Sequence, residues 1–281
     1  MKKYARLLLA VITAVTLAGC SGAAHLLPQV SEVDTNRALS EINAAPELQT
    51  YQRPISESRS IMFDSARRLQ NAAGPVCAQL EESTCAFNVV FNSDDEMNAY
   101  ASGENKIVFF QGLAKYLQSE DEFAAVIAHE MGHHIADHID KSQGNQLVGG
   151  ILTGILFALV TANSPGYVNS FQYQQDMQNM MNLGSSVGAI SFSKEHEREA
   201  DYISAYILAR AGYDLSKARL LWMKFTKESG RTKTGLFDTH PAGPERLAAW
   251  DKSVAEVAAS ADLLPNIDDA GTEEKLLGLF D

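Results

Sequence analysis

The chain has 281 residues, of which 46% are hydrophobic and 21% are charged. This composition is typical of a globular protein and excludes a disordered chain, a collagen-like repeat and a membrane protein with several spans. The formal net charge is −12, and it is −15 without the three basic residues near the N-terminus. Nothing in the sequence supplies the basic surface that nucleic-acid binding requires, so we expect no nucleic-acid partner.

The N-terminus has the pattern of an export signal. Residues 1–6 carry three basic side chains, and the apolar run over 7–17 is too short to span a bilayer. The run leads into Cys20 through a Leu-Ala-Gly sequence that resembles a bacterial lipobox. We therefore expect residues 1–19 to be a lipoprotein signal peptide and Cys20 to carry acyl chains that hold the protein on a membrane. An ordinary secretory signal with an incidental cysteine is the alternative. Ser21 in the next position favours the outer membrane, so we expect an anchored periplasmic protein.

After the signal, the patterns predict a tether, a helix and two strands. Prolines interrupt a polar segment, so residues 20–59 are expected to form a tether that contains one short helix. Apolar residues recur at helical spacing over 56–73. Two runs rich in β-branched and aromatic residues, 87–91 and 107–110, predict strands, and a short helix follows over 112–117.

Two cysteines remain after the expected lipidation site. Cys77 and Cys85 are eight positions apart in a chain that we expect to be exported, and this arrangement predicts a disulfide. Closing so small a loop would stabilise the fold by about 2–3 kcal/mol. Two reduced, buried thiols are the alternative.

The second half of the chain is predicted to be mostly helical. Ser119 and Glu122 form a capping box, which predicts a helix over 120–141. The most apolar stretch, 147–162, has sixteen residues and three glycines, which favours a buried or membrane-touching helix over a membrane span. The polar stretch over 163–184 predicts a loop or lid. Further helices are expected over 194–211, 215–228 and 244–259, and the domain boundaries are placed at 60–250 for the folded domain and 251–281 for an acidic tail.

The residues that carry chemistry lie in the middle of the helix predicted over 120–141, in the motif His-Glu-Met-Gly-His. Residues i and i+4 share one face of a helix, so His129 and His133 can direct both imidazoles at one metal ion. Glu130 is rotated by about 100° from them. It can instead reach a metal-bound water and accept its proton as a general base. A helix with two surface histidines is the alternative for these residues taken alone.

A third ligand for the metal is expected later in the chain. One known arrangement uses a histidine six positions after the second, but here the next histidines stand one and five positions after His133. The other arrangement uses a glutamate on a later helix, followed four residues on by an aspartate, and Glu197 and Asp201 fit it. Glu197 is then expected to bind the metal, and Asp201 to accept the outer N–H of a ligand histidine. Glu195 and Glu199 remain alternatives to Glu197, because the sequence does not show which helix face meets the metal.

Three motifs in this order resemble peptidase family M48, a family of zinc metallopeptidases. They are His129-Glu-Met-Gly-His133, Glu197-Arg-Glu-Ala-Asp201 and His240-Pro-Ala-Gly-Pro-Glu-Arg246. The resemblance covers about residues 60–250 and is to the periplasmic lipoprotein members rather than to the membrane proteases with several spans. It implies one zinc ion per chain, with zinc preferred over cobalt or manganese because of the ligand types.

The resemblance also implies roles for individual residues. His129, His133 and Glu197 are expected to bind zinc, and Glu130 to be the general base. His240 is expected to stabilise the oxyanion of the transition state or, alternatively, to bind the metal in a resting, inhibited form. Arg246 is expected to anchor its helix near the site through a salt bridge, although an ordinary surface arginine is the alternative.

These patterns together predict an α+β, predominantly helical, zincin-like metallopeptidase with a small sheet before the zinc helix. The strand over 107–110 is expected at the sheet edge, where an extended substrate could pair with it. The expected function is zinc-dependent cleavage of unfolded or misassembled polypeptides in the bacterial cell envelope, with outer-membrane protein assembly factors as partners. The main alternative is a chaperone-like envelope assembly factor with a plugged, largely inactive zinc site. A periplasmic metal-binding protein is a weaker alternative, because metal storage needs no general base.

Overall fold

The structure is a computed structural model that describes residues 23–80, 85–161, 168, 170–189, 194–229, 240 and 242–267, and only the backbone of 143–153 and 183–189. The expected signal peptide, Cys20 and the end of the expected tail lie outside these residues. The chain divides into two compact units. One comprises Met1–Gly22 and Asp140–Ile190, and the other comprises Ala23–Ile139 and Ser191–Asp281.

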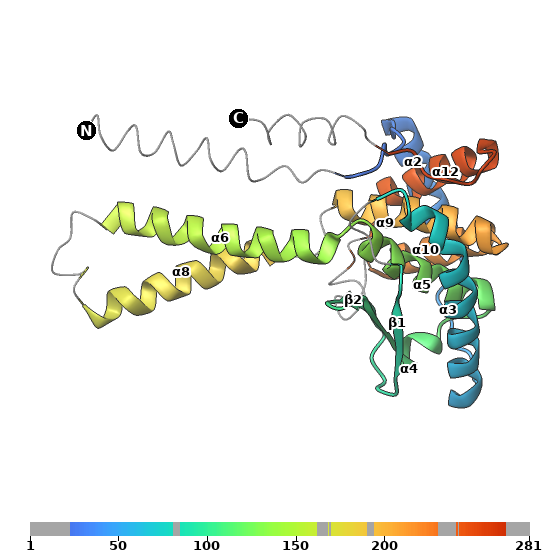
Figure 1. Cartoon of the computed structure of the whole chain (residues 1–281), viewed down its shortest axis with the longest axis horizontal. Coiled ribbons are helices and arrows are strands. Elements are labelled where there is room, and N and C mark those ends of the chain that lie inside the picture. Colours follow the sequence, from blue (N-terminus) through green and yellow to red (C-terminus); the bar gives the residue numbers. More distant parts are fainter. Residues whose placement is uncertain are drawn as a thin grey trace. The chain divides into compact units, whose positions relative to one another are not determined.

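Three helices form the centre of the larger unit. They are α3 (Ile55–Cys77), α5 (Glu120–Ile135) and α9 (Lys194–Ala211), and each packs on the other two (Figure 1). Their facing sides hold a common core in which residues such as Leu69 and Tyr206 are completely buried. The helices predicted over 56–73 and 194–211 are confirmed, because apolar residues at helical spacing are the ones that face this core.

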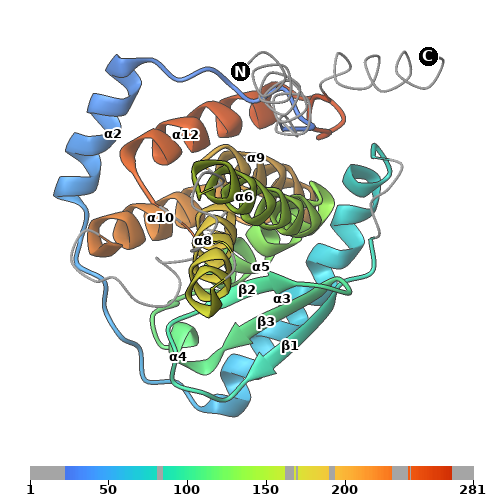
Figure 2. The same cartoon turned by 90° about the vertical axis from the view of Figure 1, so that its left-hand side faces the viewer.

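A three-stranded sheet packs against α3 and α5, as Figure 2 shows. β1 (Asn88–Asn92) runs parallel to β3 (Lys106–Phe110), and β2 (Ala99–Ser102) runs antiparallel to β3, which gives the order β1-β3-β2. Both predicted strands are present, and α4 (Gln111–Ala114) follows β3 as the short helix. The expectation that 107–110 is a sheet edge is wrong. β3 is central because β2, which we did not predict, pairs with its other side.

The helix that carries the His-Glu-Met-Gly-His motif is shorter than predicted. Its start is confirmed, since the Ser119 hydroxyl accepts a hydrogen bond from the backbone N–H of Glu122 at 3.4 Å. Its end lies at residue 135 and not at 141, because Asp137 adopts a φ of 57° in the left-handed region. Aspartate tolerates this conformation better than most residues, and it ends the helix here. A new helix, α6 (His138–Thr161), begins immediately afterwards.

The last two helices of the larger unit match their predictions closely. α10 (Leu215–Ser229) follows α9 after a turn in which Gly212 adopts a φ of 73°, and α12 (Pro244–Ala259) starts with a proline in its first turn. Trp250 of α12 is buried in the core. The helix continues past residue 251, where the acidic tail is expected to begin.

The segment expected to form a tether is in part folded onto the larger unit. It contains one helix, α2 (Glu32–Ala44), which starts with a capping box between Ser31 and Asp34. α2 packs on α10 and α12, and Ile42 is buried against Leu247 of α12. Ala38 and Ile42 of α2 are buried at this contact, so the segment gains burial that a solvated tether would not have.

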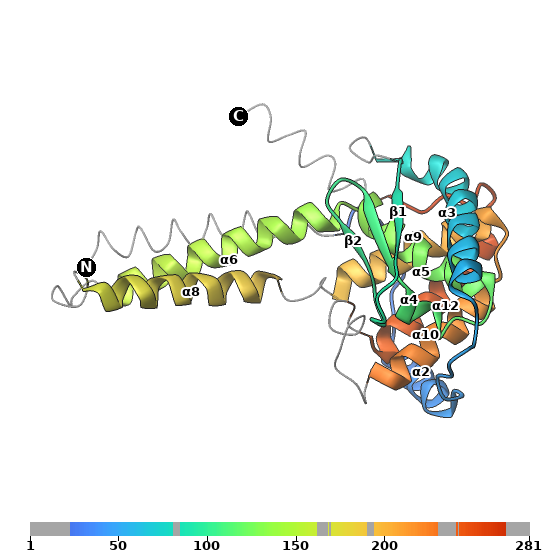
Figure 3. The same ribbon diagram turned by 90° about the horizontal axis from the view of Figure 1, so that it is seen from below.

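The smaller unit is described in residues 140–161, 168 and 170–189, and it contains most of α6 together with α8 (Phe171–Ala189) (Figure 3). The ring of Phe157 stacks on that of Tyr173 with their centres 5.4 Å apart, and a Cβ at Gly154 would touch Met181. The prediction of a loop over 163–184 is wrong from residue 171 onward. Within the described residues, no helix has both the length and the apolar character that a membrane span requires.

The two cysteines are not joined in the structure. Cys77 ends α3 and is fully buried in the core, and Cys85 packs at the edge of the same core. The expected disulfide between these two described residues is therefore absent, and burial among apolar side chains accounts for both positions.

Candidate metal centre

The site depends on the close approach of α5 and α9 at Gly132. A Cβ at this position would lie 2.7 Å from the carbonyl oxygen of Ala200 and 2.9 Å from its Cα. These distances are shorter than atoms can approach, so only glycine allows the two backbones to meet here. The contact places His129 and His133 of α5 opposite Glu197 of α9.

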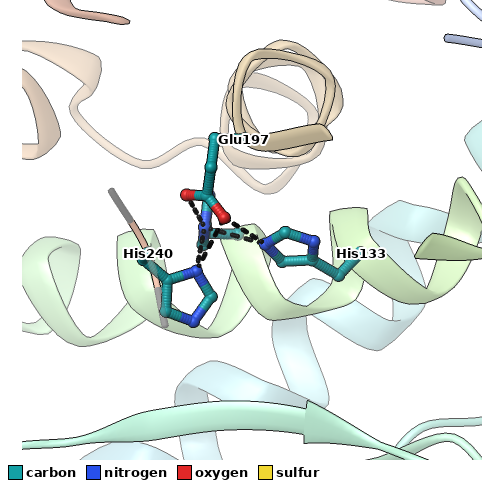
Figure 4. A group of neighbouring side chains, drawn as sticks. His133, Glu197 and His240 are labelled. Atoms are coloured by element: carbon teal, nitrogen blue, oxygen red, sulfur yellow. Dashed lines mark hydrogen bonds and ion pairs between the residues drawn. The ribbon is translucent and has the colours of Figure 1, made fainter. Parts of the chain in front are cut away.

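Four buried side chains converge at this point: His129 and His133 from α5, Glu197 from α9 and His240 from the segment before α12. The Nε2 atoms of His129 and His133 are 3.1 Å apart, and they lie 3.4 and 3.3 Å from the two carboxylate oxygens of Glu197. Nδ1 of His240 lies 3.0 Å from Oε1 of Glu197 and 3.3 Å from Nε2 of His129. Figure 4 shows His133 and His240 both directed at the Glu197 carboxylate.

The donor atoms of all four residues lie within 4.8 Å of one another, and the five separations given above are 3.0–3.4 Å, close to the spacing of ligands around one zinc ion. With bonds of 2.0–2.1 Å, neighbouring ligands of a tetrahedral zinc ion lie about 3.3 Å apart. Imidazole nitrogens and a carboxylate are donors that zinc accepts. The two alternatives to Glu197 are not in the cluster, because Glu195 is exposed and Glu199 hydrogen-bonds to other residues.

Burial and neighbouring charges set the protonation of the cluster. Burial lowers the pKa of His129, but hydrogen bonds with Asp201 and Glu197 outweigh it and raise that pKa to about 10. Burial lowers the pKa of His133 well below its usual value, and Glu197 opposes this only in part. Burial raises the pKa of Glu197, but the charges of Arg246 and His240 outweigh it and hold that pKa well below its ordinary value. A metal ion would thus bind with release of the His129 proton.

Asp201 and Arg246 hold His129 on the side away from the cluster, and we call them the first support. Nδ1 of His129 points away from the cluster and lies 2.9 Å from Oδ1 of Asp201. Arg246 donates to both oxygens of Asp201 at 2.8 Å each, and to Oε2 of Glu197 at 2.5 Å. Two parallel bonds from one guanidinium fix a carboxylate more firmly than one bond does. Asp201 thus lies against the outer nitrogen of His129, and Arg246 of α12 joins its helix to α9 through Asp201 and Glu197.

Glu130 lies beside the cluster in a mostly apolar cavity. It is completely buried, and neither carboxylate oxygen makes a hydrogen bond with another described residue. Oε1 lies 3.5 Å from Nε2 of His240. Other residues that line the cavity include Val126, Trp222, Phe225, Leu247 and Trp250. A buried carboxylate without a donor costs free energy, so it is well placed to take a proton from a water or substrate that enters.

His138 and Glu199 hold His133 on the side away from the cluster, and we call them the second support. Sequence patterns did not predict this support. Nδ1 of His133 lies 3.0 Å from Nδ1 of His138, whose Nε2 lies 3.0 Å from Oε2 of Glu199. The other oxygen of Glu199 lies 2.8 Å from Nδ1 of His25. Burial raises the pKa of Glu199, but hydrogen bonds with His138 and His25 outweigh it and lower that pKa to about 2. A spacing of five from His133 does not share its helix face, so His138 reaches this place only because the helix breaks at Asp137.

The small mixed sheet, the helix with the His-Glu-Met-Gly-His motif and the second helix with Glu197 define an α+β metallopeptidase of the zincin-like class. The sequence profile of peptidase family M48 matches residues 65–254. The chain therefore belongs to peptidase family M48.

Three similar proteins bear the names of proteases, and two of these names specify a metal-dependent protease. It is 32% identical to the mitochondrial metalloendopeptidase OMA1 of Arabidopsis thaliana over 66% of this chain and 34% of that protein. It is 28% identical to the metalloprotease LoiP of Escherichia coli K12 over 87% of this chain and 94% of LoiP. It is 26% identical to the beta-barrel assembly-enhancing protease of Yersinia pestis over 70% of this chain and 41% of that protein. The chain thus spans well under half the length of two of these relatives and nearly all of LoiP.

Proposed function

We propose that the chain is a zinc-dependent endopeptidase that cleaves unfolded or misassembled polypeptides in the bacterial cell envelope. The observation that carries the proposal is the convergence of four donor residues within 4.8 Å of one another, with the Glu130 carboxylate beside them. A site for metal storage would not need a buried carboxylate that lacks a donor. Membership in peptidase family M48 supports the same reaction.

The residues around the cluster have complementary roles in this proposal. Zinc held by His129, His133 and Glu197 would supply a Lewis acid for the scissile carbonyl and for the attacking water. Glu130 accepts the proton of that water on a carboxylate oxygen and returns it to the nitrogen of the leaving amine. Asp201 keeps a proton on Nδ1 of His129, so that the lone pair of Nε2 faces the cluster.

His240 decides between two forms of the proposal. Its Nδ1 lies at the fourth corner of the cluster, where a catalytic zinc site keeps an open position. This geometry favours the inhibited form, in which His240 must turn away before a substrate can bind. The chaperone-like alternative, in which His240 stays in place and turnover is low, rests on the same observation.

The fold suggests how a polypeptide would be held. β2 is a sheet edge that contacts α5, so an extended peptide could add to it as a further strand. Beside Glu130, the cavity wall carries the rings of Trp222, Phe225 and Trp250. We therefore expect a preference for a large apolar side chain next to the scissile bond, and such side chains are exposed in unfolded proteins.

The cellular setting also belongs to this proposal. The lipobox-like sequence supports acylation of Cys20 and an anchor in the outer membrane, facing the periplasm. Partners in outer-membrane protein assembly are proposed because relatives bear the name beta-barrel assembly-enhancing protease.

The test uses the chain from Ser21 onward with casein as an unfolded substrate. We expect one zinc ion per chain and cleavage of casein. Glu130→Gln should keep its zinc and lose activity by about 10²–10⁴-fold, because it cannot accept the proton. Zinc without cleavage in the wild type would favour the plugged form, and His240→Ala should then gain activity. A wild type that binds no zinc would contradict the proposal.

A further inference from the structure

A continuous line of hydrogen bonds, buried as far as His25, leads from His133 to a segment near the start of the described residues. It passes through His138 at the start of α6 and Glu199 on α9, and it ends at Ala24 and His25. The side chains of His138, Glu199 and His25 are all fully buried. The ring of His138 also stacks on that of His196, with centres 4.2 Å apart. We call these bonds the His133 relay.

Glu199 accepts hydrogen bonds from its neighbours on both sides in the His133 relay. Its Oε1 accepts from the backbone N–H groups of Ala24 and His25 at 2.7 and 3.1 Å, and it lies 2.8 Å from Nδ1 of His25. Its Oε2 lies 3.0 Å from Nε2 of His138. A carboxylate is an acceptor only, so His25 must carry its proton on Nδ1 and His138 on Nε2.

With a neutral His138, which is part of the proposal below, this arrangement determines which nitrogen of His133 faces the cluster without a proton. A neutral His138 that donates from Nε2 has a lone pair on Nδ1. Nδ1 of His133 is 3.0 Å away and must then be the donor. The lone pair of His133 therefore lies on Nε2, the atom that points at His129 and Glu197.

We propose that neutral His138, Glu199 and the N-terminal segment 24–25 are positioning residues that hold His133 in its metal-binding tautomer, so that docking of this segment strengthens metal binding. The inference rests on the metal site proposed above. It gives a function to a part of the chain that the sequence suggests is only a tether. Residue 25 is five positions from Cys20, so the segment that supports the site directly follows the proposed lipid anchor.

The experiment measures zinc affinity by competition with a chelating dye, using the chain from Ser21 onward. We expect the dissociation constant to rise about 10–100-fold in His138→Ala and in Glu199→Gln, as is usual when a partner behind a metal ligand is lost. His25→Ala should cause a smaller rise, because Glu199 keeps its other donors. His25→Asn should restore the affinity, since its side-chain amide can donate from the place of Nδ1.

A matched control is available one residue from His133. His134→Ala removes a half-buried histidine from the same helix, but His134 lies 3.1 Å from the carbonyl oxygen of Lys106 and not in the relay, so zinc affinity should not change. The visible absorption of the cobalt-substituted protein adds a readout of the ligand geometry, which should change in His138→Ala and not in His134→Ala.

The outcomes separate the relay from the metal site itself. If the wild type binds zinc and both His138→Ala and His25→Ala bind it equally well, the relay is wrong and the metal site stands. If the wild type binds no zinc, the metal site and the relay both fail. If His138→Ala does not fold, the pair His25→Ala and His25→Asn decides, and equal affinities in that pair would overturn the proposal.

Discussion

His129 and His133 stand one turn apart on α5, yet the structure supports them in different ways. The outer nitrogen of His129 meets the carboxylate of Asp201 directly, and Arg246 fixes that carboxylate with two hydrogen bonds. The outer nitrogen of His133 reaches a carboxylate only through His138.

The two supports also differ in how their carboxylates are neutralised. Asp201 is paired with a guanidinium, which keeps its charge at all ordinary pH values. Glu199 is held by backbone N–H groups and two imidazoles, and three of these donors come from the N-terminal segment. The first support is therefore internal to the folded domain, whereas the second depends on a segment that must dock. Three predictions test this difference, in order of expected effect.

The largest effect is expected from removing the guanidinium of the first support. Arg246→Ala removes the guanidinium that pairs with two buried carboxylates, Asp201 and Glu197, and leaves only histidines beside them. Such a loss costs about 3–5 kcal/mol in the free energy of unfolding, which denaturant titration of the zinc-free protein would measure. His25→Ala should cost less, because Glu199 keeps three donors.

Arg219 provides the control for this prediction. It also pairs with two carboxylates, Glu41 and Asp251, but all three side chains are partly exposed. Arg219→Ala should therefore cost about 1 kcal/mol or less. If both substitutions lowered the free energy of unfolding equally, the burial of Arg246 and its carboxylates would add nothing to stability.

A smaller loss of stability is expected from substitution of Gly132, because its close contact with α9 positions both His129 and His133. Gly132→Ala forces a methyl group against the backbone of Ala200, so α5 and α9 must separate and both supports are disturbed together. We expect a loss of about 1–3 kcal/mol in the free energy of unfolding, visible as a lower Tm. Gly74→Ala in α3 is the control, because a Cβ there meets nothing within 4 Å. That change should stabilise by about 0.5–1 kcal/mol, and a similar loss at both glycines would contradict the close approach.

The smallest effect concerns the independence of the two supports. Asp201→Asn acts on His129, and His25→Ala acts on His133 through two intermediates. If the supports are separate, the changes in zinc-binding free energy should add to within about 0.3–0.5 kcal/mol in the double variant. A larger interaction energy would show that the supports communicate through α9, which carries both Asp201 and Glu199.

Local patterns predicted most of the fold and part of the site. Helical periodicity predicted the positions of α3, α9, α10 and α12 to within a few residues. The apolar residues that bury one face of a helix recur at a regular spacing in the local sequence. The central position of β3 was not predictable, because it depends on pairing with β2, whose four residues carry little strand signal.

The same distinction applies to the metal centre. The sequence by itself placed His129 with His133, and Glu197 with Asp201, on one face of a helix, since residues four apart share a face. It left open whether Glu197, Glu195 or Glu199 faces the metal. Only the tertiary structure shows that Nδ1 of His240 lies beside Glu197 and His129, and that Glu199 contacts both His138 and His25, which is 174 positions before Glu199. Contacts between residues far apart in the sequence have no regular spacing that a sequence pattern could reveal. They form because buried polar groups need hydrogen-bond partners, and those partners come together only in the folded chain.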